Sequence, residues 1–150
     1  MYQLPVWVWP TALLAVCALA VWRGRDDERL AAGSVLAGWA LTLMVFKSRS
    51  EDTQWAVLLI DMGLFSVLTW VALRTRRYWP LFAAAFQLLL VVTHLARALD
   101  AGVSGWAYLT AGLVWSYLML AAVGYGAWTA VYDTEAEAGL ADDVPGAIRR

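Results

Sequence analysis

The sequence has few charges and few of the side chains from which metal and disulfide sites are built. Only 15% of its 150 residues are charged, whereas an ordinary soluble domain has about 25%. The single cysteine, Cys17, excludes an internal disulfide framework and a cysteine-rich metal or iron–sulfur site. The single histidine, His94, excludes a bis-histidine haem and a multi-histidine zinc site within one chain. With 11 basic and 12 acidic residues, the chain has no electrostatic footprint for nucleic acid.

The common catalytic motifs are also missing. The sequence contains no glycine-rich phosphate loop, no nucleophile elbow, no cysteine pair and no His-Glu-x-x-His zinc motif. A membrane enzyme or redox subunit would lack a constellation of residues that activates a nucleophile or binds a metal, and His94 offers only one axial ligand. We therefore expect no enzyme activity and no cofactor, and we interpret Cys17 as a small buried apolar residue.

Apolar residues dominate the chain. Hydrophobic residues make up 62% of it, and the mean hydropathy is +0.61. A chain this short cannot bury so much apolar surface in one soluble core, and its apolar runs have about the 20-residue length that a helix needs to cross a bilayer. The short linkers make consecutive helices antiparallel neighbours. The sequence thus predicts an all-α integral membrane protein whose residues 1–132 form a bundle of five transmembrane helices. The predicted spans are residues 5–22, 30–46, 55–73, 79–96 and 106–128.

The distribution of basic residues predicts the orientation. One set of linkers and the C-terminal tail hold eight: Arg23, Arg25, Arg29, Arg74, Arg76, Arg77, Arg149 and Arg150. The opposite side holds three: Lys47, Arg49 and Arg97. The positive-inside rule places the N-terminus outside and the C-terminus in the cytoplasm, and we expect a bacterial inner membrane. Residues 133–150 are expected to form an acidic, partly disordered cytoplasmic tail.

Asp61 is the most anomalous residue in the predicted spans. It lies six residues into an apolar run of nineteen. A carboxylate near the middle of a membrane costs about 2.5–3.5 kcal/mol on insertion scales. Desolvation favours the neutral acid unless a cation is near. Asp61 is therefore either a proton-carrying or ligand-binding group, or an acid that is protonated or paired and fixes helix contacts.

The fourth predicted span presents a second set of polar residues. Gln87 and His94 are seven residues apart and share a helix face, and Arg97 extends that face toward the outer surface. The short linker makes the third and fourth spans neighbours, so Asp61 is expected to lie near Gln87 or His94. An Asp61–His94 pair would share one proton and titrate as a unit. The alternative for His94 is an interfacial histidine bonded to a backbone carbonyl.

Small residues and tyrosines suggest further contacts. Small residues spaced four apart allow close helix approach, either within the bundle or between protomers. They are Ser34 and Gly38 in the second span, and Gly112 and Ser116 in the fifth. Three tyrosines of the fifth span either line a polar seam or pack in the core: Tyr108, Tyr117 and Tyr125.

Two functions follow from these features. The leading prediction is a non-enzymatic accessory subunit or homo-oligomer that works through helix–helix contacts, with the lipid bilayer and a membrane protein as partners. The alternative is a small transporter, channel or ligand-binding membrane sensor that uses a polar seam of Asp61, Gln87 and His94.

Overall fold

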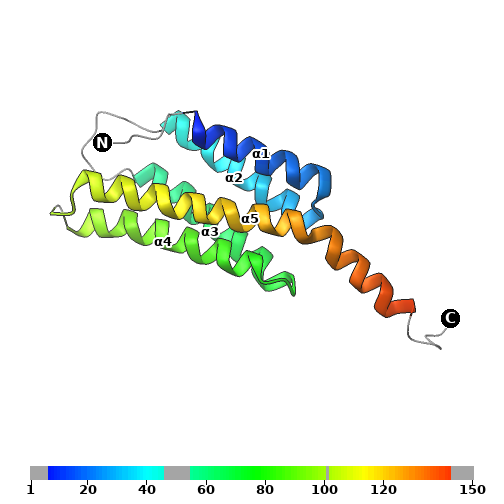
Figure 1. Ribbon diagram of the computed structural model, residues 1–150. Coiled ribbons are helices and arrows are strands. Elements are labelled where there is room, and N and C mark those ends of the chain that lie inside the picture. The colour runs from blue at the N-terminus through cyan, green and yellow to red at the C-terminus, as the bar shows by residue number, and fades with distance from the viewer. Residues whose placement is uncertain (1–6, 46–54, 101, 143–150) are drawn as a thin grey trace.

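The protein is all-helical. The computed structural model describes residues 7–45, 55–100 and 102–142, with side chains as far as residue 132. Its five helices are α1 (Val8–Arg23), α2 (Asp26–Val45), α3 (Trp55–Arg74), α4 (Trp79–Leu99) and α5 (Gly105–Asp142). Successive helices alternate in direction (Figure 1). Each packs against its neighbour in the chain, and α5 also packs against α1 and α2, which closes the bundle into a ring.

Three helices are long and apolar enough to cross a membrane, counting only the described residues. They are α3, α4 and the Gly105–Tyr132 part of α5. The helix α1 is apolar but has only 16 residues. The helix α2 has 20 residues, but its first turn carries Asp26, Asp27 and Glu28. The five helices coincide with the five apolar runs of the sequence, and α2 begins four residues before the run predicted from residue 30.

The connection between α1 and α2 is very short and depends on a glycine. Gly24 ends α1, and its N–H donates to the Ala20 carbonyl at 3.0 Å. A Cβ on Gly24 would lie 2.4 Å from the Ala20 oxygen and 2.9 Å from the Glu28 Cβ. Only glycine therefore allows the chain to reverse this tightly.

The last helix is longer than the predicted span. α5 runs without a break to Asp142, beyond the predicted span end at residue 128 and into the acidic segment. Alanine, glutamate and leucine are frequent in this segment, and they have high helix propensity. Residues 143–150 of the predicted tail lie outside the described residues.

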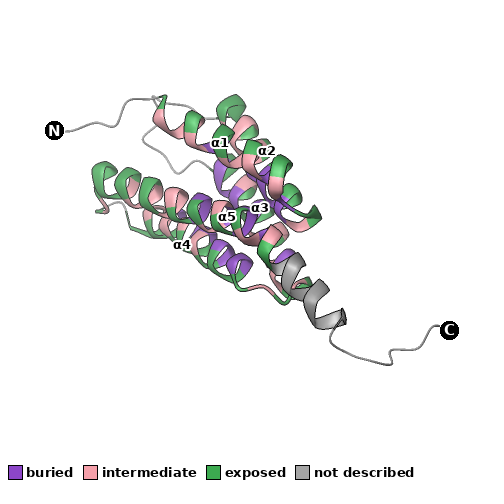
Figure 2. Cartoon of the chain, turned by 45° about the vertical axis from the view of Figure 1, so that its right-hand side comes forward, coloured by how far each residue is buried: buried purple, intermediate pink, exposed green. Residues whose placement is uncertain are grey.

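The apolar core fills one half of the ring. Its members lie in the middle and second half of α1, the first half of α2, the middle and second half of α3, the first half of α4 and the later part of α5. The most deeply buried include Leu13, Ala20, Leu68, Val71 and Val123. Figure 2 shows buried residues on the facing sides of the helices and exposed residues along their outer sides. The outer faces carry many large apolar side chains, which is the surface that a lipid environment requires.

A buried ion pair lies at the end of this packed half. We refer to Glu28, Arg77 and Trp79 as the Glu28 cluster. The Glu28 side chain is completely buried and accepts from Arg77 Nη1 and from Trp79 Nε1, the latter at 3.0 Å. Its other oxygen accepts from the Arg25 backbone N–H at 2.8 Å, as the third residue of a helix does in a capping box. The cluster links the start of α2 to the α3–α4 connection.

The Glu28 cluster also reaches α5. Arg77 Nη2 donates to the Gly126 carbonyl at 2.9 Å and to Thr129 Oγ1 at 2.8 Å. A Cβ on Gly126 would lie 2.5 Å from the Trp79 ring, so the indole fits only because residue 126 has no side chain. The cluster therefore connects the start of α2, the α3–α4 connection, the start of α4 and the later part of α5.

Candidate functional site

The other half of the ring contains a cavity. Its volume is about 320 Å³, which is within the size range of small-molecule sites. All five helices contribute: the start of α1, the second half of α2, the start of α3, the end of α4 and the start of α5. Its polar lining residues are Thr42, Asp61, Gln87, His94, Tyr108 and Ser116. The cavity thus lies where the predicted polar residues meet, and the apolar core closes the opposite half.

Asp61 points inward from α3 and is held by α4. The Gln87 Nε2 donates to Asp61 Oδ1 at 3.1 Å and to the Asp61 backbone carbonyl at 3.2 Å. A backbone carbonyl only accepts, so the nitrogen of the Gln87 amide must be the atom that faces Asp61. Both side chains are buried, with 8% exposure for Asp61 and none for Gln87.

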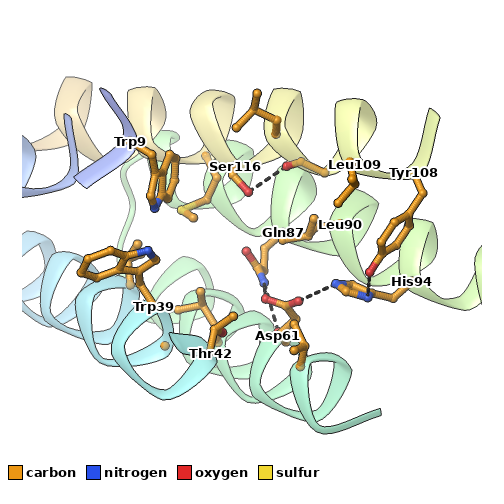
Figure 3. A pocket seen from close by; sticks show the side chains of 17 residues that line it. Trp9, Trp39, Thr42, Asp61, Gln87, Leu90, His94, Tyr108, Leu109 and Ser116 are labelled. Carbon is orange, nitrogen blue, oxygen red and sulfur yellow. Dashed lines mark hydrogen bonds and ion pairs between the residues drawn. The ribbon is translucent and has the colours of Figure 1, made fainter. Parts of the chain in front are cut away.

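His94 continues the network from Asp61 to α5. Its Nε2 lies 2.9 Å from Asp61 Oδ2, and its Nδ1 lies 2.8 Å from the Tyr108 hydroxyl oxygen. The His94 and Tyr108 rings also meet edge to face, with centroids 5.4 Å apart. These distances agree with the contact between Asp61 and the fourth span that the sequence predicted. Figure 3 shows the series from Gln87 through Asp61 and His94 to Tyr108 along one wall of the cavity.

The network can hold or lose one proton without breaking a hydrogen bond. With the proton present, either His94 is an imidazolium beside a carboxylate, or Asp61 is neutral and donates to Nε2. Without it, a neutral His94 donates Nε2–H to Asp61, and its Nδ1 accepts from the Tyr108 hydroxyl. The hydrogen bonds of the three side chains are therefore satisfied in both protonation states.

One buried acceptor in the network is unused. Gln87 Oε1 accepts no hydrogen bond from the described residues. Leaving a buried acceptor unpaired costs about 1–3 kcal/mol. Gln87 lines the cavity, so a molecule inside it that has an N–H or O–H group can supply the missing donor.

Aromatic rings form the part of the cavity farthest from Tyr108. Trp9 of α1 and Trp39 of α2 lie together at one side, and His94 and Tyr108 lie at the other (Figure 3). Trp9 is supported from behind by Tyr117, which it meets edge to face with centroids 5.1 Å apart. The cavity therefore has a polar side and an indole side.

The remaining predicted site residues have different positions. Arg97 donates through Nη1 to the Val103 carbonyl in the α4–α5 connection. Gly38 and Gly112 line the cavity, and a Cβ on them would lie 3.7 Å from Leu64 and 3.4 Å from Leu90, respectively. Ser116 lines the cavity and donates to the Gly112 carbonyl at 2.8 Å. Ser34 donates to the Ala31 carbonyl within α2 and is half-buried.

Sequence reasoning missed several functional or structural residues. Tyr108 was one of three tyrosines with two open interpretations, and no periodicity separates it from Tyr117 and Tyr125. Glu28 had a usable signal, because acidic residues at 26–28 are typical of a first helical turn. No set of three or more histidine, cysteine or acidic side chains that could hold a metal ion occurs in the described ranges.

Comparison with known proteins gives no family for this chain: no protein-family model, curated protein or solved structure matches it. The geometry of the cavity is therefore the basis for a functional proposal.

Proposed function

We propose that the protein is a five-span membrane protein that binds a small molecule in its central cavity, as a ligand-binding sensor or a transporter. The observation that carries the proposal is the buried, unused acceptor Gln87 Oε1 on a cavity of about 320 Å³. Buried polar groups are normally paired, and unpaired ones concentrate where a ligand or water completes the site. The indole side supplies the apolar surface that small-molecule sites usually contain.

The asymmetry of the ring supports binding rather than simple packing. A bundle that served only as a scaffold would gain from filling both halves with apolar side chains, because an apolar core has no desolvation cost. Here one half is filled and the other keeps a carboxylate, an amide, an imidazole and a phenol around open volume. Intramembrane ionisable residues mark ligand or ion sites by default.

Membrane topology is part of the proposal. α1 and α2 would cross the bilayer with α3, α4 and α5, since they complete the same ring and run antiparallel to their neighbours. With the N-terminus outside a bacterial inner membrane, the cavity would lie in the outer half and the Glu28 cluster at the cytoplasmic end. Reporter fusions test this arrangement at Asp26, Glu51, Arg76, Gly102 and Asp142. We expect cytoplasmic signals at the first, third and fifth of these positions; any other alternation contradicts the topology.

The binding test uses the purified protein in phosphatidylcholine nanodiscs and equilibrium dialysis. Three probes share a phenyl ring and differ in their polar end: 2-phenylethylammonium, 2-phenylethanol and phenylacetate. We expect the protein to retain at least one of them at a ratio of one to one. Retention of none of the three would refute the proposal.

A matched pair of variants locates the binding. Ser116→Leu places an apolar side chain in the cavity and should abolish retention. Ser66→Leu is the control, because the Ser66 hydroxyl donates to its own helix at 2.8 Å in the same way but lies on the exposed face of α3. Equal retention by the two variants would place the binding outside the cavity. That result would favour the prediction of an accessory subunit, and proteins that co-purify in mild detergent would test it.

A further inference from the structure

We propose that the ligand of the cavity is an organic ammonium ion with an apolar or aromatic group, and that it binds in exchange for the proton shared by Asp61 and His94. This inference rests on the proposed function and specifies its ligand class and its coupling. It follows from the charge of the lining, the hydrogen-bonding capacity of the lining and the position of the indoles.

The net charge of the cavity lining depends on three ionisable side chains. Asp61 from α3 is the acid, His94 from α4 the base, and Tyr108 from α5 the phenol; α1 and α2 contribute no ionisable side chain. With the shared proton in place, the net charge of this described lining is zero. Without it, the charge is −1. Arg97 and Asp100 lie beyond His94 toward the α4–α5 connection, where Arg97 donates to Val103 and Asp100 accepts from the Gly102 N–H.

The hydrogen-bond network is already arranged for the state in which the Asp61–His94 pair has lost its shared proton. Loss of the proton leaves the Gln87, His94 and Tyr108 hydrogen bonds intact, as the 3.1, 2.9 and 2.8 Å distances allow. The network need not rearrange when the proton leaves. What is lost is the balancing charge, and a carboxylate in a low-dielectric site requires a cation to replace it.

The cavity lining offers hydrogen-bond acceptors on Gln87 and Asp61. Gln87 Oε1 is unused, and Asp61 Oδ1, which accepts from Gln87 Nε2, keeps a further lone pair. A primary ammonium group has three donors and no acceptor, so it matches this pair of oxygens. A carboxylate ligand has no donor at neutral pH, and an alcohol can donate only once.

The opposite side of the cavity is formed by two indole rings. Trp9 and Trp39 stand apart from the His94–Tyr108 side, across the cavity (Figure 3). Indole faces attract cations and pack against apolar rings. A molecule with an ammonium group at Gln87 and a ring toward the indoles satisfies both sides at once.

The charge balance gives the exchange. The ammonium ion enters, and one proton leaves the Asp61–His94 pair, so that the lining and its ligand together stay neutral. Protons and the ligand therefore compete. Ammonium binding should weaken by up to about tenfold per pH unit as the solution becomes more acidic, because one proton is exchanged per ligand.

Calorimetry on the nanodisc protein tests the inference with the same three probes. Titrations in two buffers of different ionisation enthalpy count the protons released. We expect 2-phenylethylammonium to bind at least about tenfold more tightly than 2-phenylethanol, with release of about one proton. Phenylacetate should bind most weakly. Asp61→Asn should retain alcohol binding and lose both the cation preference and the proton release, while Asp100→Asn, which changes a carboxylate outside the cavity, should keep both.

The outcomes separate the two proposals. One-to-one binding of the alcohol or phenylacetate as tight as that of the ammonium ion would overturn this inference and leave the proposed function standing. No binding of any probe would overturn both. If Asp61→Asn does not fold, the pH dependence of the unmodified protein decides: ammonium affinity must fall with acidity while alcohol affinity does not, and a parallel response of the two overturns the exchange.

Discussion

Removal of Glu28 should strongly destabilise the protein. The Glu28→Ala substitution leaves the Arg77 Nη1, the Trp79 Nε1–H and the Arg25 backbone N–H without their acceptor. Arg77 keeps its bonds to Gly126 and Thr129 through Nη2, so its charge stays at the buried end of the bundle. The consequence is that the buried guanidinium loses Glu28 as its ion-pair partner.

The expected magnitude follows from this geometry. Removing one partner of a buried ion pair costs about 3–5 kcal/mol. The Glu28 side chain has no exposure and that of Arg77 has 16%, so solvent screening reduces this cost only slightly. Glu28→Gln keeps an acceptor for Arg77 and Trp79 but replaces the oxygen that accepts from Arg25 by a donor, and should cost about 1–3 kcal/mol. Asp26→Ala, on the exposed side of the same turn, should cost less than about 1 kcal/mol.

A double-mutant cycle separates the ion pair from packing. Unfolding in mixed micelles with increasing dodecyl sulfate, followed by circular dichroism, gives the free energy of unfolding for Glu28→Ala, Arg77→Met and the combination. The double variant should be more stable than the sum of the single effects by about 0.5–3 kcal/mol, because the two single variants each break the same Glu28–Arg77 ion pair. If the two single effects add strictly, or if Glu28→Ala lowers the free energy of unfolding by less than about 1 kcal/mol, the Glu28–Arg77 ion pair does not stabilise the fold as proposed.

Two further substitutions test close contacts in the two halves of the ring by the same unfolding assay. Gly126→Ala places a methyl group against the indole ring and should cost about 1–3 kcal/mol, whereas Gly33→Ala, which meets nothing within 4 Å, should stabilise by up to about 1 kcal/mol. Equal changes in the free energy of unfolding for Gly126→Ala and Gly33→Ala would contradict the close contact between Gly126 and the Trp79 ring. Tyr108→Phe removes the partner of His94 Nδ1 and should cost about 0.5–1.5 kcal/mol, while Tyr125→Phe, on the surface, should change nothing. An unchanged free energy of unfolding for Tyr108→Phe would show that this hydrogen bond does not stabilise the fold.

Much of the site could be anticipated from the sequence because its anomalies are local. An aspartate in an apolar run is unexpected wherever the run packs, and a helix repeat places Gln87 and His94 on one face without knowledge of the neighbours. The short connection between the third and fourth runs then brings Asp61 within reach of that face. The observed 3.1 and 2.9 Å distances are consistent with these three local facts.

Glu28 shows the limit of local reasoning. In the sequence it stands among Arg25, Asp26, Asp27 and Arg29, a charged stretch that is typical of an exposed first helical turn and does not predict burial. Its burial arises only because the turn at Gly24 folds the start of α2 against the chain near Arg77, 49 residues later.

The sequence alone predicted five helices that alternate in direction, because the length of an apolar run and the length of a linker are properties of single segments. The tertiary structure alone decided that one half of the ring is filled and the other is hollow. That difference depends on which side chains from five helices reach the same depth: apolar side chains such as Leu68, Trp79 and Val123 meet in one half, and the polar network meets Trp9 and Trp39 in the other. Volume left between helices is a sum over distant segments, so no single stretch of sequence encodes it.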